Sequence, residues 1–448
     1  MSLQTKLIYL FSLIISVAQA QEKPREFSPY SRFGIGDLAD PNLSSVSQLG
    51  GAGAAFCDRN LLNAANPASL GFLKNTAFEG GVSIKNTGLK ESGQSKSFFG
   101  GGLDYLALGL PLQNQINDVL ERVNRKWHVG TMIVLKPYSF VGYSVAQRGN
   151  ASDIGNYQIN YTGNGGTYAF KWNTAVAYQN LSVGVGLQYL FGKMSYQRVS
   201  SLVDSAYSLR PITYSSIFAD DISMHGFNWN FGIQYKINLK KPEEGENESS
   251  KFLTLGVYGN GNHDFTTTAN QLYRRILTNS GTSAAADTVK NLSGVDGIGT
   301  LPKEIHFGVY YNDKYKFQVG AQYSMVGWSN YKNAAKPETL KNASEFALGV
   351  GYCPNIESFD NFFERVTYRL GFRTGTDPRS FNDQQLKFYA FNVGASLPFI
   401  FQRKVSFINL GLEFGKMGIS SGLDTHYTQV KLGFTLNDDD WFLRKKYD

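Results

Sequence analysis

The chain of 448 residues combines 14% aromatic residues with only 18% charged residues. The aromatic content excludes a disordered chain, and the charged fraction lies below the roughly 25% that is typical of soluble domains. Outside the first 20 residues no apolar run reaches the ~18 residues that a spanning helix needs, which excludes a polytopic helical transporter. The formal net charge of +7 is carried by scattered basic pairs and not by a basic stripe, so nucleic-acid binding has no support.

The first 20 residues have the pattern of a secretory signal peptide. One positive charge at Lys6 is followed by the apolar run from Leu7 to Val17 and by the small-x-small site Ala18-Gln19-Ala20. We therefore expect residues 1–20 to be a signal peptide and the mature chain to begin at Gln21. An exported protein meets an oxidising compartment, where Cys57 and Cys353 could pair or stay as two separate buried thiols; the sequence leaves both open.

Residues 21–74 show no alternation of apolar and polar residues and contain several turn formers. Gly50, Gly51 and Gly53 permit tight backbone turns, and Pro67 within Asn66-Pro67-Ala68 fixes its own φ and lacks a backbone donor. This composition predicts a kinked, non-strand segment that ends just before a first strand near Thr76. The Asn-Pro-Ala motif can be a plain packing turn or part of a gate.

A second feature of this segment is the stretch from Ser28 to Asp37. It is dense in aromatic and basic side chains, among them Tyr30, Arg32 and Phe33, which are residue types favoured at binding surfaces. Two interpretations remain open, namely internal packing and contact with a partner protein.

From residue 75 to residue 437 the chain alternates with a period of two, which is typical of β-strands. The clearest examples are the runs 181–191 and 227–237. Fifteen segments show the pattern: 76–86, 97–110, 127–135, 140–147, 167–178, 181–191, 227–237, 252–260, 303–311, 315–325, 344–352, 365–373, 385–399, 404–415 and 426–436. A membrane barrel is expected to have an even number of strands, so one strand is split or missed, and we suspect the regions 152–161 or 207–223.

The polarity of the two strand faces decides between a soluble sandwich and a membrane barrel. One face is largely Gly, Ser, Asn and Gln, whereas the other is apolar with Phe, Trp and Tyr at the strand ends. A soluble sheet would turn charged residues to water, but a polar lumen with an apolar, aromatic-rimmed outside suits a closed barrel in lipid. We predict an all-β, antiparallel transmembrane barrel of 14 strands, with 16 as the alternative, in the outer membrane of a Gram-negative bacterium. Outer-membrane lipid is its expected surroundings.

Two shorter features flank the strands. Residues 114–124 carry apolar residues on one helical face and predict a small amphipathic helix. Residues 438–448 form a tail beyond the last strand, expected on the periplasmic side, where Trp441 and Phe442 could anchor at the membrane interface or contact a partner.

No motif for catalysis or metal binding is present. The five histidines lie far apart, and none has a second His or a Cys at metal-ligand spacing. The chain also lacks a Gly-x-Ser-x-Gly elbow, a P-loop and a dinucleotide fingerprint. We therefore expect no enzymatic activity, no metal and no cofactor.

The N-terminal motifs point to a family. The Gly/Ala-rich stretch from Gly50 to Ala55, followed by Asp58 and Asn66-Pro67-Ala68, resembles the N-terminal hatch of the FadL-type outer-membrane transporters. Leu301-Pro302 and the Gly308, Tyr311, Tyr323 and Trp328 that follow are similar to a second pattern of that family. The resemblance implies a 14-stranded barrel plugged by a hatch at residues 21–74, with residues 75–437 as the barrel.

The same resemblance implies two functions. Its best-known members take up long-chain fatty acids or aromatic hydrocarbons, so the leading hypothesis is a transporter of hydrophobic compounds gated by the hatch. Other members serve protein secretion as partner-binding barrels, so the alternative is a non-transporting subunit of an outer-membrane protein assembly or secretion complex, with other outer-membrane or periplasmic proteins as partners. An open porin is the least favoured, because the hatch would fill the lumen.

Overall fold

The computed structural model describes most of the chain. The described residues are 26–91, 94–113, 117, 125–152, 155–202, 213–240, 249–279, 282–313, 316–401, 404–419 and 424–438. The expected signal peptide, nearly all of the expected helix at 114–124 and the tail residues Trp441 and Phe442 lie outside these ranges. No helix among the described residues is long and apolar enough to span a membrane.

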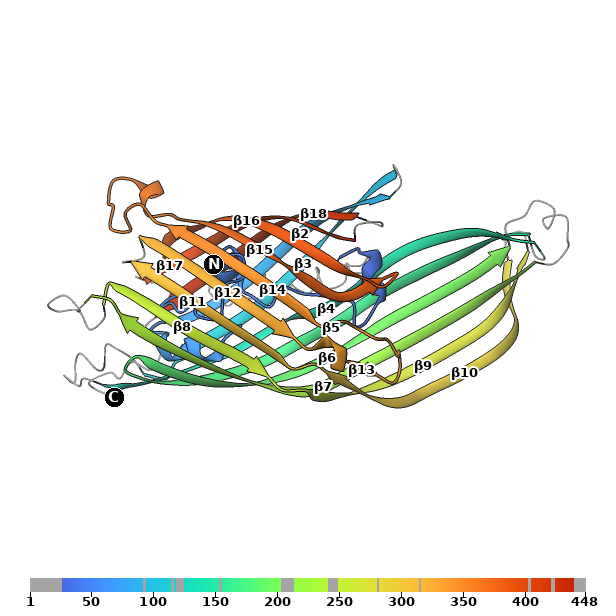
Figure 1. Ribbon diagram of the computed structural model, residues 1–448, viewed down its shortest axis with the longest axis horizontal. Coiled ribbons are helices and arrows are strands. Elements are labelled where there is room, and N and C mark those ends of the chain that lie inside the picture. Colours follow the sequence, from blue (N-terminus) through green and yellow to red (C-terminus); the bar gives the residue numbers. More distant parts are fainter. Residues whose placement is uncertain are drawn as a thin grey trace, which may run out of the picture.

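Within the described residues, fourteen strand positions close into one antiparallel barrel (Figure 1). The strands are β2 (Thr76–Glu91), β3 (Gln94–Pro111), β4 (Trp127–Ala151), β5 (Gly155–Tyr178), β6 (Leu181–Leu202), β7 (Thr213–Asn238), β8 (Lys251–Asn260), β9 (His263–Asn279), β10 (Thr282–Leu301), β11 (Glu304–Asp313), β12 (Phe317–Val326), β14 (Ala343–Tyr352), β15 (Thr367–Phe381), β16 (Gln384–Phe401), β17 (Lys404–Gly418) and β18 (Asp424–Asp438). The last strand pairs with the first, Asp438 opposite Thr76, which closes the barrel.

Two barrel positions are each formed by two strands in line. β7 pairs with β9 through its first half and with β8 through its second half, so β8 and β9 form one interrupted strand. β10 and β11 likewise form one, because β11 pairs with β8 and β10 pairs with β9. The predicted all-β antiparallel barrel of 14 strands is thereby confirmed.

The count of fifteen segments is corrected at β4. The segments 127–135 and 140–147 belong to this single strand, whose pairing with β5 shifts between Pro137 and Ser139. Proline lacks a ladder donor and forces such an irregularity, which interrupts the alternation without ending the strand. The suspected regions 152–161 and 207–223 hold no extra strand in their described parts, which belong to β5 and β7.

The outer face carries an apolar band between two aromatic rows. At the end of the barrel where β2 begins and β18 ends, here called the terminal end, Phe317, Tyr352 and Tyr368 lie side by side on β12, β14 and β15. At the other end of the band, Phe170 and Phe227 flank Tyr189. On β5 the two rows are eight residues apart, from Phe170 to Tyr178. At ~3.4 Å per residue this is roughly 27 Å along the strand, or about 21 Å of height at a strand tilt of ~40°, which is comparable with the ~25 Å lipid-facing band of outer-membrane barrels.

Six strands continue past this band at the opposite end, here called the hairpin end. The outer parts of β4, β5, β6 and β7, together with β9 and β10, form a curved sheet that projects beyond the other strands (Figure 1). Its inner side carries a hydrophobic core in which Met194, Ile222 and Phe265 pack with Trp328 and Tyr331 of the connection between β12 and β14. This connection holds η3 (Trp328–Asn330) and β13 (Lys332–Asn333).

The remaining short elements precede the barrel strands or connect them. They are η1 (Pro29–Arg32), β1 (Asp37–Leu38), α2 (Ser44–Ser47), η2 (Pro67–Phe72) and η4 (Phe362–Glu364). Cys57 and Cys353 are both buried and form no disulfide with each other.

Candidate functional site: the occupied lumen

Residues 26–75, here called the N-terminal segment, pack against the inner wall of the barrel. The closest approaches are at glycines that face inward from ten different strands. A β-carbon at any of these glycines would lie less than 3.0 Å from an atom of the N-terminal segment. These glycines, here called the inner glycine ring, are Gly109, Gly130, Gly184, Gly232, Gly256, Gly308, Gly349, Gly371, Gly394 and Gly433.

Strand register places several members of the ring directly opposite one another. Gly184 faces Gly232, Gly256 faces Gly308, and Gly349 faces Gly371. Since glycine has no side chain, these pairs leave a shallow depression that the backbone of the N-terminal segment fills. The small residues on the polar strand faces are therefore a seat for the segment and not an open channel lining.

The Asn-Pro-Ala motif forms the start of a short 3₁₀ helix. Asn66 is the N-cap of η2, and its side-chain oxygen accepts a hydrogen bond of 3.0 Å from the backbone N–H of Ala68. Pro67 occupies the first turn, where its missing N–H is not needed. The Asn66 amide donates to the carbonyl of Ala54 at 2.6 Å, and Ser182 of β6 donates to the carbonyl of Ala68 at 2.5 Å.

The other motif residues shape the turns of the same segment. Gly50 and Gly51 have φ of +68° and +89°, which favours glycine, and Gly50 also lies against the backbone of β14 and β15. A β-carbon at Gly53 would lie 3.0 Å from the side chains of Asn42 and Val46, so a side chain there would be tightly packed. The Asp58 carboxylate accepts the backbone N–H groups of Asn60 and of Leu61, at 2.8 and 3.2 Å, and burial raises the pKa of Asp58.

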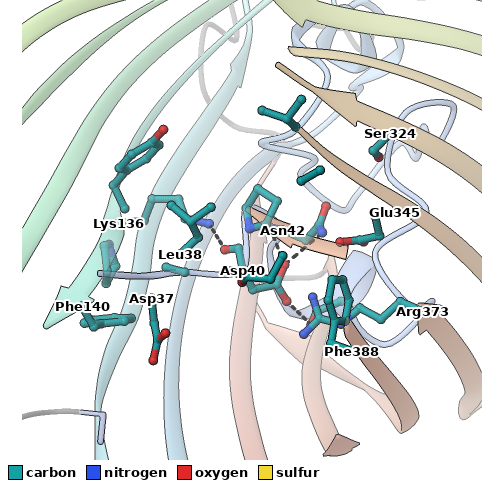
Figure 2. A pocket seen from close by; sticks show the side chains of 18 of the residues that line it. Asp37, Leu38, Asp40, Asn42, Lys136, Phe140, Ser324, Glu345, Arg373 and Phe388 are labelled. Carbon is teal, nitrogen blue, oxygen red and sulfur yellow. Dashed lines mark hydrogen bonds between the residues drawn. The ribbon is translucent and has the colours of Figure 1, made fainter. Parts of the chain in front are cut away.

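A network of charged side chains, here called the ionic cluster, fixes the N-terminal segment to the wall; Figure 2 labels three of its members, Asp40, Lys136 and Arg373. Asp40 of the segment pairs with Lys431 of β18 at 2.7 Å, and Lys431 also approaches Glu413 of β17 at 3.4 Å. Glu413 pairs with Arg373 of β15 at 2.5 Å, while Lys136 of β4 donates to the backbone oxygen of Asp40. Sequence reasoning missed these residues, although Arg373, Glu413 and Lys431 fall in the inward phase of their strands.

The ionic cluster also determines the charge state of Asp40. Burial alone would raise the pKa of this carboxyl, but the positive charges of Lys431, Arg373 and Lys136 outweigh burial. They hold the pKa of Asp40 well below its usual range, so the carboxylate is charged at neutral pH.

A cavity of about 320 Å³ remains between the N-terminal segment and the wall (Figure 2). Eight carboxylate side chains and six lysine or arginine side chains line it, including the ionic cluster, Glu345 and Lys171. His306 lines it too and is buried, with Nδ1 lacking a hydrogen-bond partner among the described residues. Apolar and aromatic side chains such as Phe140, Trp328 and Phe388 share this lining, so a ligand held in the cavity would meet charged groups as well as apolar surface.

The stretch from Ser28 to Asp37 lies at the hairpin end and packs onto β4. Tyr30 is buried against Leu386 and Ile419, so its ring faces the wall. Arg32 is exposed and lies over the ring of Tyr161 at 4.2 Å, and Phe33 is partly buried. Of the three residues of this stretch that were singled out for partner contact, Arg32 is therefore the most accessible.

The described residues bring together no group of three or more His, Cys, Asp or Glu side chains that could hold a metal ion. Acidic side chains of the lumen such as Asp40 and Glu413 are instead paired with lysine and arginine in the ionic cluster.

The fold, the aromatic rows and the filled lumen define the chain as a 14-stranded antiparallel β-barrel of the membrane type. Within this class it resembles the solved structure of a FadL homologue from Pseudomonas aeruginosa, with 13% identity and a TM-score of 0.54 over 90% of this chain and 99% of that chain. It also resembles the CymD monoaromatic hydrocarbon channel, with 14% identity and a TM-score of 0.50 over 91% and 99% of the two chains. At such identities the likeness establishes the fold alone.

The chain belongs to the BamG family, whose model matches residues 2–448. No curated protein sequence matches it.

Proposed function

We propose that this chain is a sealed, non-transporting barrel subunit of an outer-membrane protein assembly or secretion complex. The observation that carries the proposal is the charged lining of the lumen. Fourteen acidic and basic side chains are part of the lining of a cavity of about 320 Å³, and the N-terminal segment packs closely against ten of the surrounding strands.

Energetics argue against a hydrophobic passenger in this cavity. An aromatic hydrocarbon or an acyl chain would displace the water that solvates charged groups such as Glu345 and Lys171, and uncompensated burial of a charge is strongly unfavourable. The likeness to hydrocarbon channels supports the barrel fold and does not offset this cost. Membership of the BamG family points the same way, since by name it is a different family from these channels.

A moving hatch is also disfavoured by the inner glycine ring. Release of the N-terminal segment would have to break close contacts with ten strands together with the ionic cluster. A ligand shifts such an equilibrium only by its differential affinity for the two states, and the charged cavity offers a hydrophobic ligand little affinity. We therefore assign the segment a structural role as a fixed plug.

The orientation of the barrel in the membrane is inferred from general features of outer-membrane barrels. Outer-membrane barrels carry their larger extensions on the extracellular side, and an even strand number leaves both chain ends on the other side. We therefore place the projecting sheet of the hairpin end outside the cell and the terminal end in the periplasm.

Native mass spectrometry of the protein, extracted from its own outer membrane in mild detergent, tests the proposal because it detects bound protein and bound lipid together. We expect a fixed stoichiometric complex with other proteins and no fatty-acid-sized ligand. A free monomer that carries such a ligand, combined with loss of fatty-acid uptake in a deletion strain, would establish the transporter and refute the scaffold.

A further inference from the structure

The connection between β14 and β15, residues 353–366, lies at the terminal end (Figure 1), and several of its apolar side chains are exposed to water. Phe359 is 93% exposed and Phe363 is 68% exposed, and Ile356 and Phe362 are exposed beside them. We call these four residues the phenylalanine tip. Sequence reasoning did not single them out, although four large apolar residues in one connection were visible there.

The phenylalanine tip lies beyond the lipid-facing band. The connection leaves β14 at Tyr352 and enters β15 after Val366, and Tyr352 and Tyr368 belong to the aromatic row that marks the terminal end of the band. Residues 353–366 therefore begin where the band ends, so the strands do not hold the tip at the depth of the acyl chains.

The connection that carries the tip is ordered by its own hydrogen bonds. The backbone N–H of Asn355 donates to the carbonyl of Glu364 at 2.9 Å, and the Asn361 side chain caps η4 by accepting from the N–H of Phe363 at 3.0 Å. Tyr368 donates to the carbonyl of Phe363 at 3.2 Å. An ordered loop that exposes aromatic rings loses little conformational entropy when it binds a partner, which is a property of a preformed binding element.

The charged residues beside the phenylalanine tip indicate whether it binds a groove on a protein or a lipid surface. Glu357, Asp360 and Glu364 flank the phenylalanines, with Arg365 as the single basic residue among them. Anionic lipid headgroups attract basic segments and repel acidic ones. The local charge therefore complements a protein surface with basic residues around an apolar groove.

We propose that the phenylalanine tip inserts Phe359 and Phe363 into an apolar groove of a periplasmic protein whose rim carries lysine or arginine. This inference rests on the proposed function, because it names the kind of partner that the sealed barrel holds on its periplasmic side. The aromatic rings supply the buried contact area, and the three carboxylates supply orientation and specificity.

The test uses the full-length protein in its native membrane. A photoreactive phenylalanine analogue at position 359 should cross-link to one periplasmic protein, identified by mass spectrometry, with the cross-linked peptide next to Lys or Arg. The double variant Phe359→Ser/Phe363→Ser should reduce recovery of that same protein in the native complex by at least about tenfold, as expected for buried aromatic anchors. The matched control is Phe99→Ser, because Phe99 is 76% exposed on β3, and it should leave the recovery unchanged.

A charge-reversal variant distinguishes binding to a protein from binding to an anionic membrane. Glu357→Lys/Asp360→Lys should weaken the protein contact, whereas it would strengthen binding to an anionic membrane. Cross-linking to lipid alone, or an unchanged complex in the double phenylalanine variant, would overturn the inference and leave the scaffold function standing. A wild-type protein that runs as a free monomer would instead refute the scaffold function itself.

Discussion

The inner glycine ring allows a test with a single added carbon atom. At Gly256 of β8 a β-carbon would lie 2.0 Å from the carbonyl oxygen of Ala54, whereas ordinary contact begins near 3.4 Å. The Gly256→Ala substitution should therefore displace the N-terminal segment locally by more than about 1 Å, since overpacked backbone must move. The displaced carbonyl would strain the hydrogen bonds that it accepts from Asn66 and from Gln234, at 2.6 and 3.0 Å.

The size of this displacement effect can be measured through the chemical reactivity of a native thiol. Cys57 is buried in the N-terminal segment, with its sulfur 3.5 Å from Thr254 of the same strand β8. Overpacking costs about 1–3 kcal/mol, which at ~1.4 kcal/mol per tenfold raises the open population between about fivefold and about a hundredfold. Maleimide labelling of Cys57 in a Cys353→Ser background should accelerate by this factor, because a buried thiol reacts from the open state.

A matched glycine supplies the control. At Gly261, a few residues further along, a β-carbon would meet only the ring of Trp229 at an ordinary 3.6 Å. Gly261→Ala should therefore label at the wild-type rate. If Gly256→Ala also labels at the wild-type rate while the barrel stays folded, the ring does not hold the N-terminal segment and the sealed-lumen reasoning fails.

Three further outcomes follow from the same contacts. Lys431→Met removes the ion-pair partner of Asp40 and should lower the free energy of unfolding by about 3–5 kcal/mol in denaturant titration, whereas Lys416→Met, at a partly exposed pair, should cost about 0–1 kcal/mol. Because the pKa of Asp40 is lowered in the folded protein, its stabilisation is present above the unfolded pKa of ~3.9 and is lost as the pH falls. The loss of thermal stability in Asp40→Asn should thus be constant above about pH 5 and shrink below it; a constant loss down to pH 2 would contradict the pairing. Asn66→Ala removes the cap of η2 and should accelerate labelling of Cys57, consistent with a cost of about 1–2 kcal/mol, while an unchanged rate would assign the motif no packing role.

The barrel was predictable because the lipid-facing side of a strand is apolar and its lumen side is polar, so apolar and polar residues alternate along the sequence with a period of two. The runs 181–191 and 227–237 fall within β6 and β7, and their apolar positions face outward. The pattern failed at Pro137, where a single irregularity within β4 resembled a break between two strands. Local sequence cannot distinguish a bulge from a turn when proline produces both.

The ionic cluster was not predictable for a different reason. Asp40 and Lys431 are separated by 391 positions, and no local pattern encodes such a contact. One partial indication of the cluster was present in the sequence, namely the position of its charged residues in the alternation. Glu413 and Lys431 lie on the polar face of strands that mostly carry small or polar residues there. The glycines on the same face were recognised as small residues, but which of them would meet the N-terminal segment depends on strand register, which one sequence does not reveal.

The filled lumen also constrains the order in which the protein can fold. Asp40 is synthesised early but bonds to Lys431 in the last strand, and the barrel closes only when β18 pairs with β2. Pairings of such long sequence separation form late and slowly because the intervening chain must first be ordered. We therefore expect the N-terminal segment to be in place before β18 pairs with β2, so that the final strand closes the barrel around it. A barrel that assembles in this order encloses its own N-terminal segment, which then cannot leave unless the strands separate again.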